Sequence, residues 1–194
     1  MNVIIDFFAD VPLVFRTSIL LGGIVLFWIL EGIIPLYSFN YKKGRHAFLN
    51  LLFTTTTAII GFGFAFLLLK STEIVNEFQF GVIHFFELPL FVEVIISLLI
   101  LDLVGAYLVH FVEHKVPWMW KFHVIHHSDK NVDVTTGLRH HPGETVFRIL
   151  FTILGVYISG ASIGIVMLYQ SLSVLFAHLT HANISLPQNL DRII

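Results

Sequence analysis

The stretch TSILLGGIVLFWILEGIIPLY, residues 17–37, decides the fold of this chain. It is almost uniformly apolar, and it is long enough to cross a hydrocarbon core of about 30 Å as an α-helix. Pro35 and Tyr37 mark its exit, with the tyrosine at the depth of the lipid headgroups. The stretch lacks a basic n-region, carries Glu31 and has no small-residue cleavage pattern. It therefore predicts a retained membrane span and not a secretory signal peptide.

The rest of the sequence extends this interpretation to the whole chain. Hydrophobic residues make up 56% of the 194 residues and charged residues only 12%, whereas about a quarter of the residues in soluble domains are charged. Residues 47–69 and 88–112 predict two further spans. The apolar segment 145–182 is too long for one span, and Gly155, Ser159 and Gly160 predict a break that turns it into a helical hairpin. We predict an all-α integral membrane helical bundle that forms one domain, residues 1–194.

Basic residues near the ends of the spans predict the orientation in the membrane. They are concentrated in the loop between the first two spans and in the segment 113–144, as Lys42, Lys43, Arg45, Lys115, Lys121, Lys130 and Arg139. The loop of residues 70–87 has Lys70 alone against three glutamates. We therefore expect the segment 113–144 to face the cytoplasm, the N-terminus to lie on the other side, and a two-crossing hairpin to return Arg192 to the cytoplasmic side.

Cysteine is absent, which excludes disulfides, iron–sulfur clusters and thiolate ligands. The formal net charge of -2, without a basic run, argues against nucleic-acid binding. Any metal must therefore be held by nitrogen and oxygen, and the chain has 11 histidines to supply nitrogen.

Nine of the 11 histidines fall between residues 110 and 181. His110 and His114 are four residues apart, so a helix points them in nearly the same direction. The stretch WKFHVIHHSDKN, residues 120–131, gives its three histidines the i, i+3, i+4 spacing of one helix face. The others form pairs near predicted helix ends: His140 with His141, and His178 with His181.

A metal centre explains this grouping. Protonated imidazoles buried together repel one another, and neutral ones need partners. A metal resolves both problems because it binds the deprotonated nitrogens. A structural zinc takes four ligands, fewer than the cluster offers, so the surplus indicates two ions. A bis-histidine haem fits less well, and a two-iron centre suits oxygen chemistry beside lipid. His46 and His84 stand apart and are expected to be polar residues at the membrane interface.

Four sequence motifs carry a family resemblance. They are D-x4-Y-x2-H-x3-H at 102–114, W-x-F-H-x2-H-H-S at 120–128, R-x-H-P-x-E at 139–144 and H-A-N-I-x-L-P at 181–187. Together they resemble the fatty acid hydroxylase and sterol desaturase superfamily over roughly residues 100–194, and E-G-x-x-P at 31–35 is similar to its bacterial members. Phe111 stands where the family often has arginine. Members are integral membrane di-iron enzymes that use O2 and two electrons to hydroxylate or desaturate lipids.

The resemblance implies metal-binding roles for the histidines in these motifs, namely His110, His114, His123, His126, His127, His141 and His181. His140 and His178 are weighed equally as further ligands, as donors that support a ligand and as interfacial polar residues. Ligating imidazoles are oriented through their second nitrogen, so supporting roles are expected for Asp102, Glu113, Glu144 and Asn183. Three of these have structural alternatives: a helix–helix hydrogen bond for Asp102, an acid in a first helical turn for Glu144, and a helix cap for Asn183.

By the same resemblance, the chain is expected to oxidise a lipid C–H bond, of a sterol, fatty acyl or related lipid, with two iron ions as cofactors and O2 as co-substrate. The chain has no flavin fingerprint, so the electrons are expected from a cytoplasmic donor, a ferredoxin or a cytochrome b5-like protein.

The family also carries a last H-x2-H-H box shortly after the position of residues 187–192. This sequence reads NLDRII at residues 189–194 and contains no such box, so we expect an incomplete site. A non-catalytic or degenerate membrane metal-binding protein is therefore the main alternative, and a haem-binding membrane protein a weaker one.

Overall fold

The computed structural model describes residues 2–191, and within this range the chain is built from helices. The only strand-like pairing in the described part is an isolated bridge between Pro35 and Ile184. The prediction of an all-α fold is confirmed. The elements in chain order are α1 Asn2–Ala9, α2 Leu13–Ile33, α3 Lys43–Glu77, η1 Val82–Phe85, α4 Leu90–Asp102, η2 Leu103–Leu108, α5 Val109–Lys115, α6 Pro117–His127, η3 Val134–Leu138, α7 Pro142–Ser159, α8 Ile163–His181 and α9 Gln188–Asp191.

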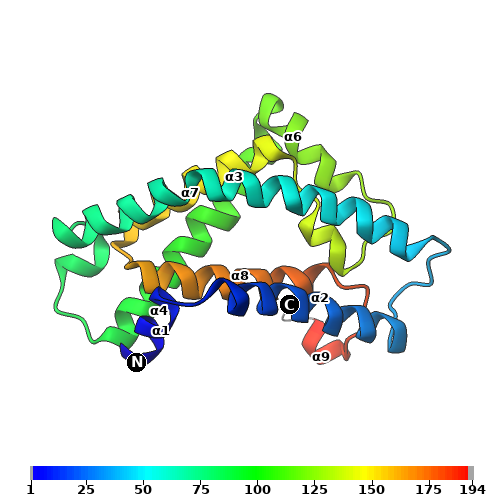
Figure 1. Ribbon diagram of the computed structural model, residues 1–194, viewed down its shortest axis with the longest axis horizontal. Helices are drawn as coiled ribbons and strands as arrows, with labels where there is room; N and C mark the ends of the chain where they lie inside the picture. Colours follow the sequence, from blue (N-terminus) through cyan, green and yellow to red (C-terminus); the bar gives the residue numbers. More distant parts are fainter. Residues whose placement is uncertain (1, 192–194) are drawn as a thin grey trace.

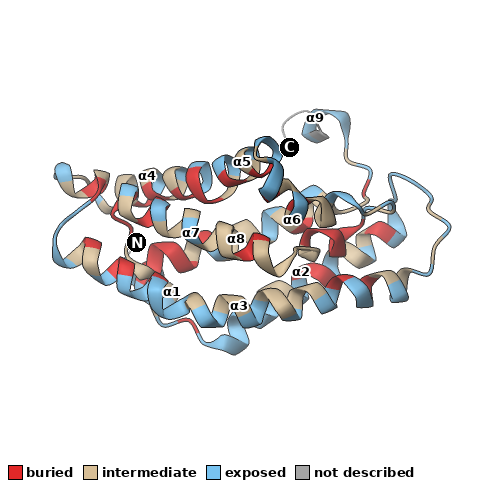
Figure 2. Ribbon diagram, turned by 90° about the horizontal axis from the view of Figure 1, so that it is seen from above, coloured by how far each residue is buried: buried red, intermediate tan, exposed pale blue. Residues whose placement is uncertain are grey.

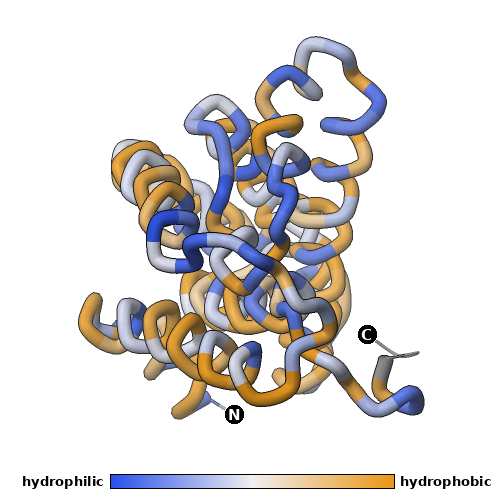
Figure 3. The backbone as a smooth tube through the Cα atoms, turned by 90° about the vertical axis from the view of Figure 1, so that its right-hand side faces the viewer, coloured by the Kyte–Doolittle hydropathy of each residue, from blue (hydrophilic) through white to orange (hydrophobic). Residues whose placement is uncertain are grey.

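Four helical segments are long and apolar enough to cross a membrane, as judged by length and composition. They are Leu13–Ile33, Lys43–Phe85, Leu90–Lys115 and Ile163–His181. In the first two, at most 11% of the most apolar window is buried inside the protein, so most of their apolar surface faces outward, where lipid would cover it. Figure 3 shows hydrophobic positions along the helices and hydrophilic ones mainly in the connections.

The helix ends differ from the predicted ends of the spans by a few residues. Helix α2 ends at Ile33, four residues before the predicted exit, because a proline disfavours helical backbone at the residue before it, here Ile34. Helix α3 has 35 residues, roughly 52 Å at 1.5 Å per residue, and contains the whole predicted span 47–69. The third span is one continuous rod of α4, η2 and α5, in which η2 is a turn of π-helix.

The predicted hairpin of α7 and α8 forms the centre of the bundle. The turn falls at Gly160, one of the residues expected to break the segment, and its φ of 84° is a left-handed conformation that favours glycine. Helix α3 packs on α7, α1 and α2 pack on α8, and α4 packs on both. Figure 1 shows α3 alongside α7 and α2 alongside α8.

The two ends of the bundle have different interiors. At one end, apolar side chains of α1, α3, α4, α7 and α8 form the core, with Val75, Leu101, Val156 and Val166 almost completely buried. At the other end the buried side chains are polar or charged and include Glu113, His123 and Glu144. Figure 2 shows buried positions along the inner sides of the helices. The charged interior therefore lies where the histidine motifs meet.

A buried carboxylate connects α2 to this polar end. Oε1 of Glu31 accepts hydrogen bonds from the backbone N–H groups of Val134 (2.7 Å) and Asn183 (2.9 Å), and Oε2 accepts one from Lys43 (2.7 Å). These bonds fix the start of η3 and the segment after α8 against the end of α2.

His46 lies in a second network instead of standing alone at an interface. Its Nε2 bonds to Asp129 (2.8 Å) and its Nδ1 to Asp133 (3.0 Å), and Tyr41 donates its hydroxyl to Asp133. Burial, together with the hydrogen bond and negative charge of Asp133, raises the pKa of the Tyr41 phenol. The network ties the start of α3 to the loop between α6 and η3. We expected a lone histidine at the interface, and the two aspartates are partners that this expectation did not include.

Candidate metal centre

A sharp bend between α5 and α6 brings the first two histidine motifs together. Helix α5 ends at Lys115, Val116 is extended (φ -96°, ψ 110°), and Pro117 opens α6 at its first position. Proline suits that position because the missing N–H has no helical partner there. The two helices then contact each other, so the i, i+4 pair of α5 faces the i, i+4 pair of α6.

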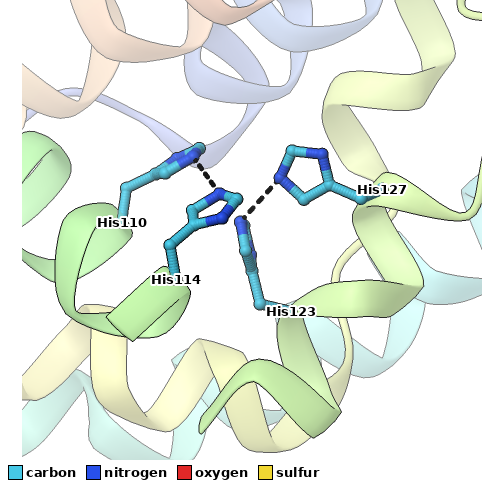
Figure 4. Close-up of side chains that lie close together, drawn as sticks. All are labelled: His110, His114, His123 and His127. Atoms are coloured by element: carbon cyan, nitrogen blue, oxygen red, sulfur yellow. Dashed lines mark hydrogen bonds between the residues drawn. The ribbon is translucent and has the colours of Figure 1, made fainter. Parts of the chain in front are cut away.

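The first histidine cluster consists of His110, His114, His123 and His127. Nε2 of His110 lies 3.0 Å from Nε2 of His114, and Nε2 of His123 lies 3.0 Å from Nε2 of His127. One nitrogen from each ring lies within 4.8 Å of all the others. Figure 4 shows the four rings converging on one point.

This geometry fits a metal ion. Nitrogen ligands about 2.1 Å from a tetrahedral ion lie about 3.4 Å from one another; here two pairs of nitrogens are 3.0 Å apart and all four lie within 4.8 Å of one another, so small shifts would complete a site. Two pairs of imidazole nitrogens that face each other satisfy at most one N–H per pair, whereas a cation accepts all four lone pairs. The four residues therefore share one locus, and metal binding by them stays a prediction.

Two buried carboxylates support the cluster from behind. Nδ1 of His123 donates to Oε1 of Glu144 (3.0 Å) and lies 3.5 Å from Oε2 of Glu113. Arg148 bridges the two acids, with Nε 2.9 Å from Glu144 and one terminal nitrogen 3.0 Å from Glu113. A carboxylate on the second nitrogen fixes the tautomer and the ring orientation of a ligating histidine. The supporting roles predicted for Glu113 and Glu144 thus agree with the contacts, although Glu144 also lies in the first turn of α7.

The electrostatics outside the spans favour neutral imidazoles beside an ionised acid. Burial, followed by the charge of His140, lowers the pKa of His126 to about 3. Burial and the nearby His123 lower the pKa of His127. Burial alone would raise the pKa of Glu144, but hydrogen bonds from His123 and His140 hold it well below its usual range. At neutral pH, His126 and His127 therefore keep lone pairs available for a metal.

A second histidine cluster, formed by His126, His140 and His181, adjoins the first. Nε2 of His126 lies 3.2 Å from Nε2 of His181, and the rings of His126 and His140 stack with centroids 5.0 Å apart. His181 donates Nδ1–H to the Ala177 carbonyl (2.8 Å), which leaves its Nε2 free for a metal. Both ring nitrogens of His140 face oxygens, of Glu144 and Gly137. His126 and His181 thus each have an Nε2 that could bind a metal, whereas both ring nitrogens of His140 already face oxygens.

Four other predicted residues lie outside both clusters. His141 caps α7, accepting the Gly143 N–H at its Nδ1 (2.9 Å). His178 is buried against Gly23 and Phe27, and its ring nitrogens have no partner among the described residues. Asn183 does not orient a histidine or cap a helix, because its side chain exchanges hydrogen bonds with the backbone of Tyr37. Ligation by His141 and His178 stays a prediction, as does Asp102 as a support. The expected position of the last histidine box extends into residues 192–194, which lie outside the described residues.

Sequence reasoning missed two residues at the site. Arg148 lies four residues after Glu144, a spacing typical of a helical ion pair, so the pattern was available. The other is Trp120, whose ring centroid lies 5.1 Å from that of His114 and 5.6 Å from that of His127. The contact with His114 depends on the bend at Pro117, whereas His127 lies seven residues further along the same face of α6.

Two cavities meet at His110. One, of about 620 Å³, is lined by His126, His140 and His181 at one end and by apolar side chains of α4 and α8 such as Leu98 and Phe176. The other, of about 690 Å³, extends along η2 and α5 past Tyr107. Both are lined by Asp102 and Arg148. A π-helical turn at this point agrees with the frequent use of such turns at functional sites.

The comparisons with known proteins identify the family of this arrangement. The model of the fatty acid hydroxylase family matches residues 94–194, more than half of the chain. The chain belongs to the fatty acid hydroxylase family. The ornithine lipid hydroxylase OlsE of Rhizobium tropici is 23% identical over 189 residues, which cover 93% of this chain and 56% of that relative. This chain thus spans little more than half the length of the curated relative. No solved structure matches it.

Proposed function

We propose that this member of the fatty acid hydroxylase family oxidises a C–H bond of a membrane lipid with O2 at a pair of histidine-bound iron ions. The observation that carries the proposal is the 620 Å³ cavity, which joins histidines of both clusters to an apolar passage between α4 and α8. An acyl chain or ring system fits such a passage, because pockets for apolar ligands are concave and mostly apolar with a few placed polar groups.

The donor set supports two ions in adjoining positions. His110, His114, His123 and His127 would hold one, and His126 and His181 would contribute to the other. The rings of His123 and His126, one from each cluster, have centroids 5.6 Å apart, so the two clusters adjoin. When bound, iron supplies the reduction of O2 and the oxidising power for the C–H bond.

The protein's own residues would prepare the site for that chemistry. Glu144 and Glu113 hold the His123 ring through its Nδ1, and Arg148 holds both carboxylates. The apolar walls at Leu98 and Phe176 would exclude water and hold the substrate chain beside the histidines. Such positioning raises the rate because the reacting carbon need not search for its orientation.

Two features guide the search for the substrate. The relative OlsE is named an ornithine lipid hydroxylase, so an ornithine-containing lipid is the first substrate to test, followed by fatty acyl lipids and sterols. Asp102 lines both cavities within a predicted span. An ionisable residue at such a depth is costly and usually functional, so we infer that it faces a polar group of the lipid or an ordered water.

The electrons would come from a cytoplasmic carrier, a ferredoxin or a cytochrome b5-like protein. The chain has no cysteine to hold an iron–sulfur cluster, so a separate protein has to supply two electrons per turnover. The proposal puts the histidine end of the bundle on the cytoplasmic side, because basic residues are concentrated in the loops at that end.

The deciding experiment is lipid mass spectrometry of whole cells that express the protein, compared with cells that express His110→Ala or His126→Ala. Lipids that gain one oxygen atom or lose two hydrogen atoms are expected only with the intact histidines. His84→Gln is the matched control, since His84 contacts Gly160 at the other end of the bundle. Metal bound by the purified protein without any change in lipids would favour the non-catalytic metal-binding alternative. A haem absorption band would favour the alternative of a haem-binding membrane protein.

A further inference from the structure

The outer side of the first histidine cluster is covered by one aromatic ring, which the proposed function leaves without a role. The plane of the Trp120 indole is tilted by 41° from the His114 ring and by 31° from the His127 ring, with centroid distances of 5.1 Å and 5.6 Å. His114 and His127 are themselves exposed. Two of the four histidines in the cluster are therefore reached from the protein surface beside a single tryptophan.

A surface hollow lies at the same place. It has a volume of about 290 Å³ and is lined by His114, Lys115, Pro117 and Trp120. None of these residues lines the 620 Å³ cavity between α4 and α8, although His114 and Lys115 also line the 690 Å³ cavity that passes Tyr107. The hollow thus approaches the cluster from a different direction than the proposed substrate passage, and it is too small for a lipid while large enough for one side chain or a cofactor edge.

The charges around the hollow have one sign. Lys115 and Lys121 are the exposed lysines of α5 and α6, and Glu113, the acid on these two helices, is buried against Arg148. Asp129, just after α6, is held by His46. An approaching surface therefore meets two positive charges and two exposed imidazoles.

We propose that the face formed by Lys115, Trp120 and Lys121 docks an acidic one-electron carrier protein, with Trp120 as its contact to the histidine cluster. The inference rests on the proposed function, which requires electrons from outside. For hydroxylation the balance is O2 + RH + 2 e⁻ + 2 H⁺ → ROH + H2O, so two carrier molecules are each oxidised by one electron. Charge complementarity selects an acidic partner because it steers encounter and register.

The competing occupant of this face is the membrane surface. Tryptophan and lysine together are also typical of residues at the lipid interface, and Lys115 lies 5.5 Å over the Phe111 ring. A carrier and a lipid headgroup region cannot cover Lys121 at the same time, so the two occupants give different results in one experiment.

The test measures binding of a plant-type [2Fe–2S] ferredoxin, and separately of the soluble domain of cytochrome b5, to the full chain in nanodiscs of neutral phosphatidylcholine. We expect the double variant Lys115→Glu, Lys121→Glu to weaken carrier binding about tenfold or more at low ionic strength, and the difference to shrink near 1 M salt, where the Debye length falls to about 3 Å. Lys70→Glu, a charge reversal of the same kind far along α3, should leave the Kd unchanged. Trp120→Leu should slow reoxidation of the reduced carrier, and Trp120→Phe should restore most of the rate.

Carrier affinity that is equal in the wild type and the double variant would overturn the docking face. So would a photoreactive benzoylphenylalanine in place of Lys121 that cross-links only lipid. Neither outcome touches the proposed function, which is judged from lipid oxidation in cells. Conversely, if the protein binds the carrier through these lysines but changes no lipid, the docking face is supported and the proposed reaction is refuted.

Discussion

Replacing Glu144 by glutamine should weaken metal binding without preventing folding. Oε1 of Glu144 accepts three hydrogen bonds, from Nδ1 of His123 (3.0 Å), Nδ1 of His140 (2.8 Å) and Nε of Arg148 (2.9 Å). The side-chain amide in the Glu144→Gln variant keeps an oxygen acceptor but lacks the negative charge. Its NH2 group would take the place of the wild-type Oε2. That oxygen is buried and has no hydrogen-bond partner among the described residues, so the substitution breaks no bond there.

The magnitude follows from what each bond does. A hydrogen bond to a charged group contributes about 1.5–3 kcal/mol and a neutral one about 0.5–1.5 kcal/mol, so losing the charge costs about 1 kcal/mol per bond. With three such bonds, the free energy of unfolding of the Glu144→Gln variant should fall by about 3 kcal/mol. Only the bond to His123 orients a proposed ligand directly, and loss of such support typically weakens metal binding about 10–100-fold.

The assay is competition for Zn²⁺ or Fe²⁺ between a chelator and the purified protein, with helix content followed by circular dichroism. Glu77→Gln is the matched control, because Glu77 is exposed on α3 and should bind metal like the wild type. In a His123→Ala background, the effect of Glu144→Gln should largely disappear, since the ligand it supports is gone. Wild-type affinity in Glu144→Gln, or full additivity with His123→Ala, would refute this account of the support.

Three further outcomes are expected. Gly23→Ala should destabilise the protein by about 1–3 kcal/mol, because the new Cβ would lie 2.3 Å from Nδ1 of His178; thermal unfolding in detergent should show the loss, and adding His178→Ala should recover most of it. Asp102→Leu should leave metal affinity unchanged but alter lipid turnover, because Asp102 lines both cavities, and equal turnover of every tested lipid would contradict this. Glu31→Leu should cost about 3–5 kcal/mol, because two backbone N–H groups and Lys43 lose their partner, whereas Glu73→Leu on the exposed surface should cost less than about 1 kcal/mol.

The sequence predicted the helices and the first histidine cluster because both depend on local patterns. The i, i+4 spacing of His110 with His114, and of His123 with His127, fixes which rings share a helix face. Apolar length fixes the spans, and Gly160 marks the turn of the hairpin. The acids that support His123 were also identifiable, because ligating imidazoles need a partner for their second nitrogen.

The remaining features depend on contacts between distant segments, which spacing does not encode. His141 and His178 occur in or beside the same motifs as the clustered histidines, yet one caps α7 and the other faces α2. His46 appeared isolated in the sequence, and its two aspartates lie more than 80 residues further along the chain. Asn183 could not be assigned for the same reason, since its partner Tyr37 belongs to the loop after α2.

The family match begins at residue 94, but Glu31 shows that the unit which folds is larger. The carboxylate of Glu31 and the side chains of His46 and Asn50 all precede the matched region, and together they hold the loop and the start of η3, residues 129–135. A fragment cut at residue 94 would keep every histidine of both clusters and lose the braces of the segment between α6 and α7. During synthesis, α2 and α3 therefore precede their partners: until the later segments arrive, Glu31 has only Lys43 and His46 lacks its aspartates. Swapping the N-terminal half between relatives should consequently fail unless Glu31, His46 and Asn50 are transferred together.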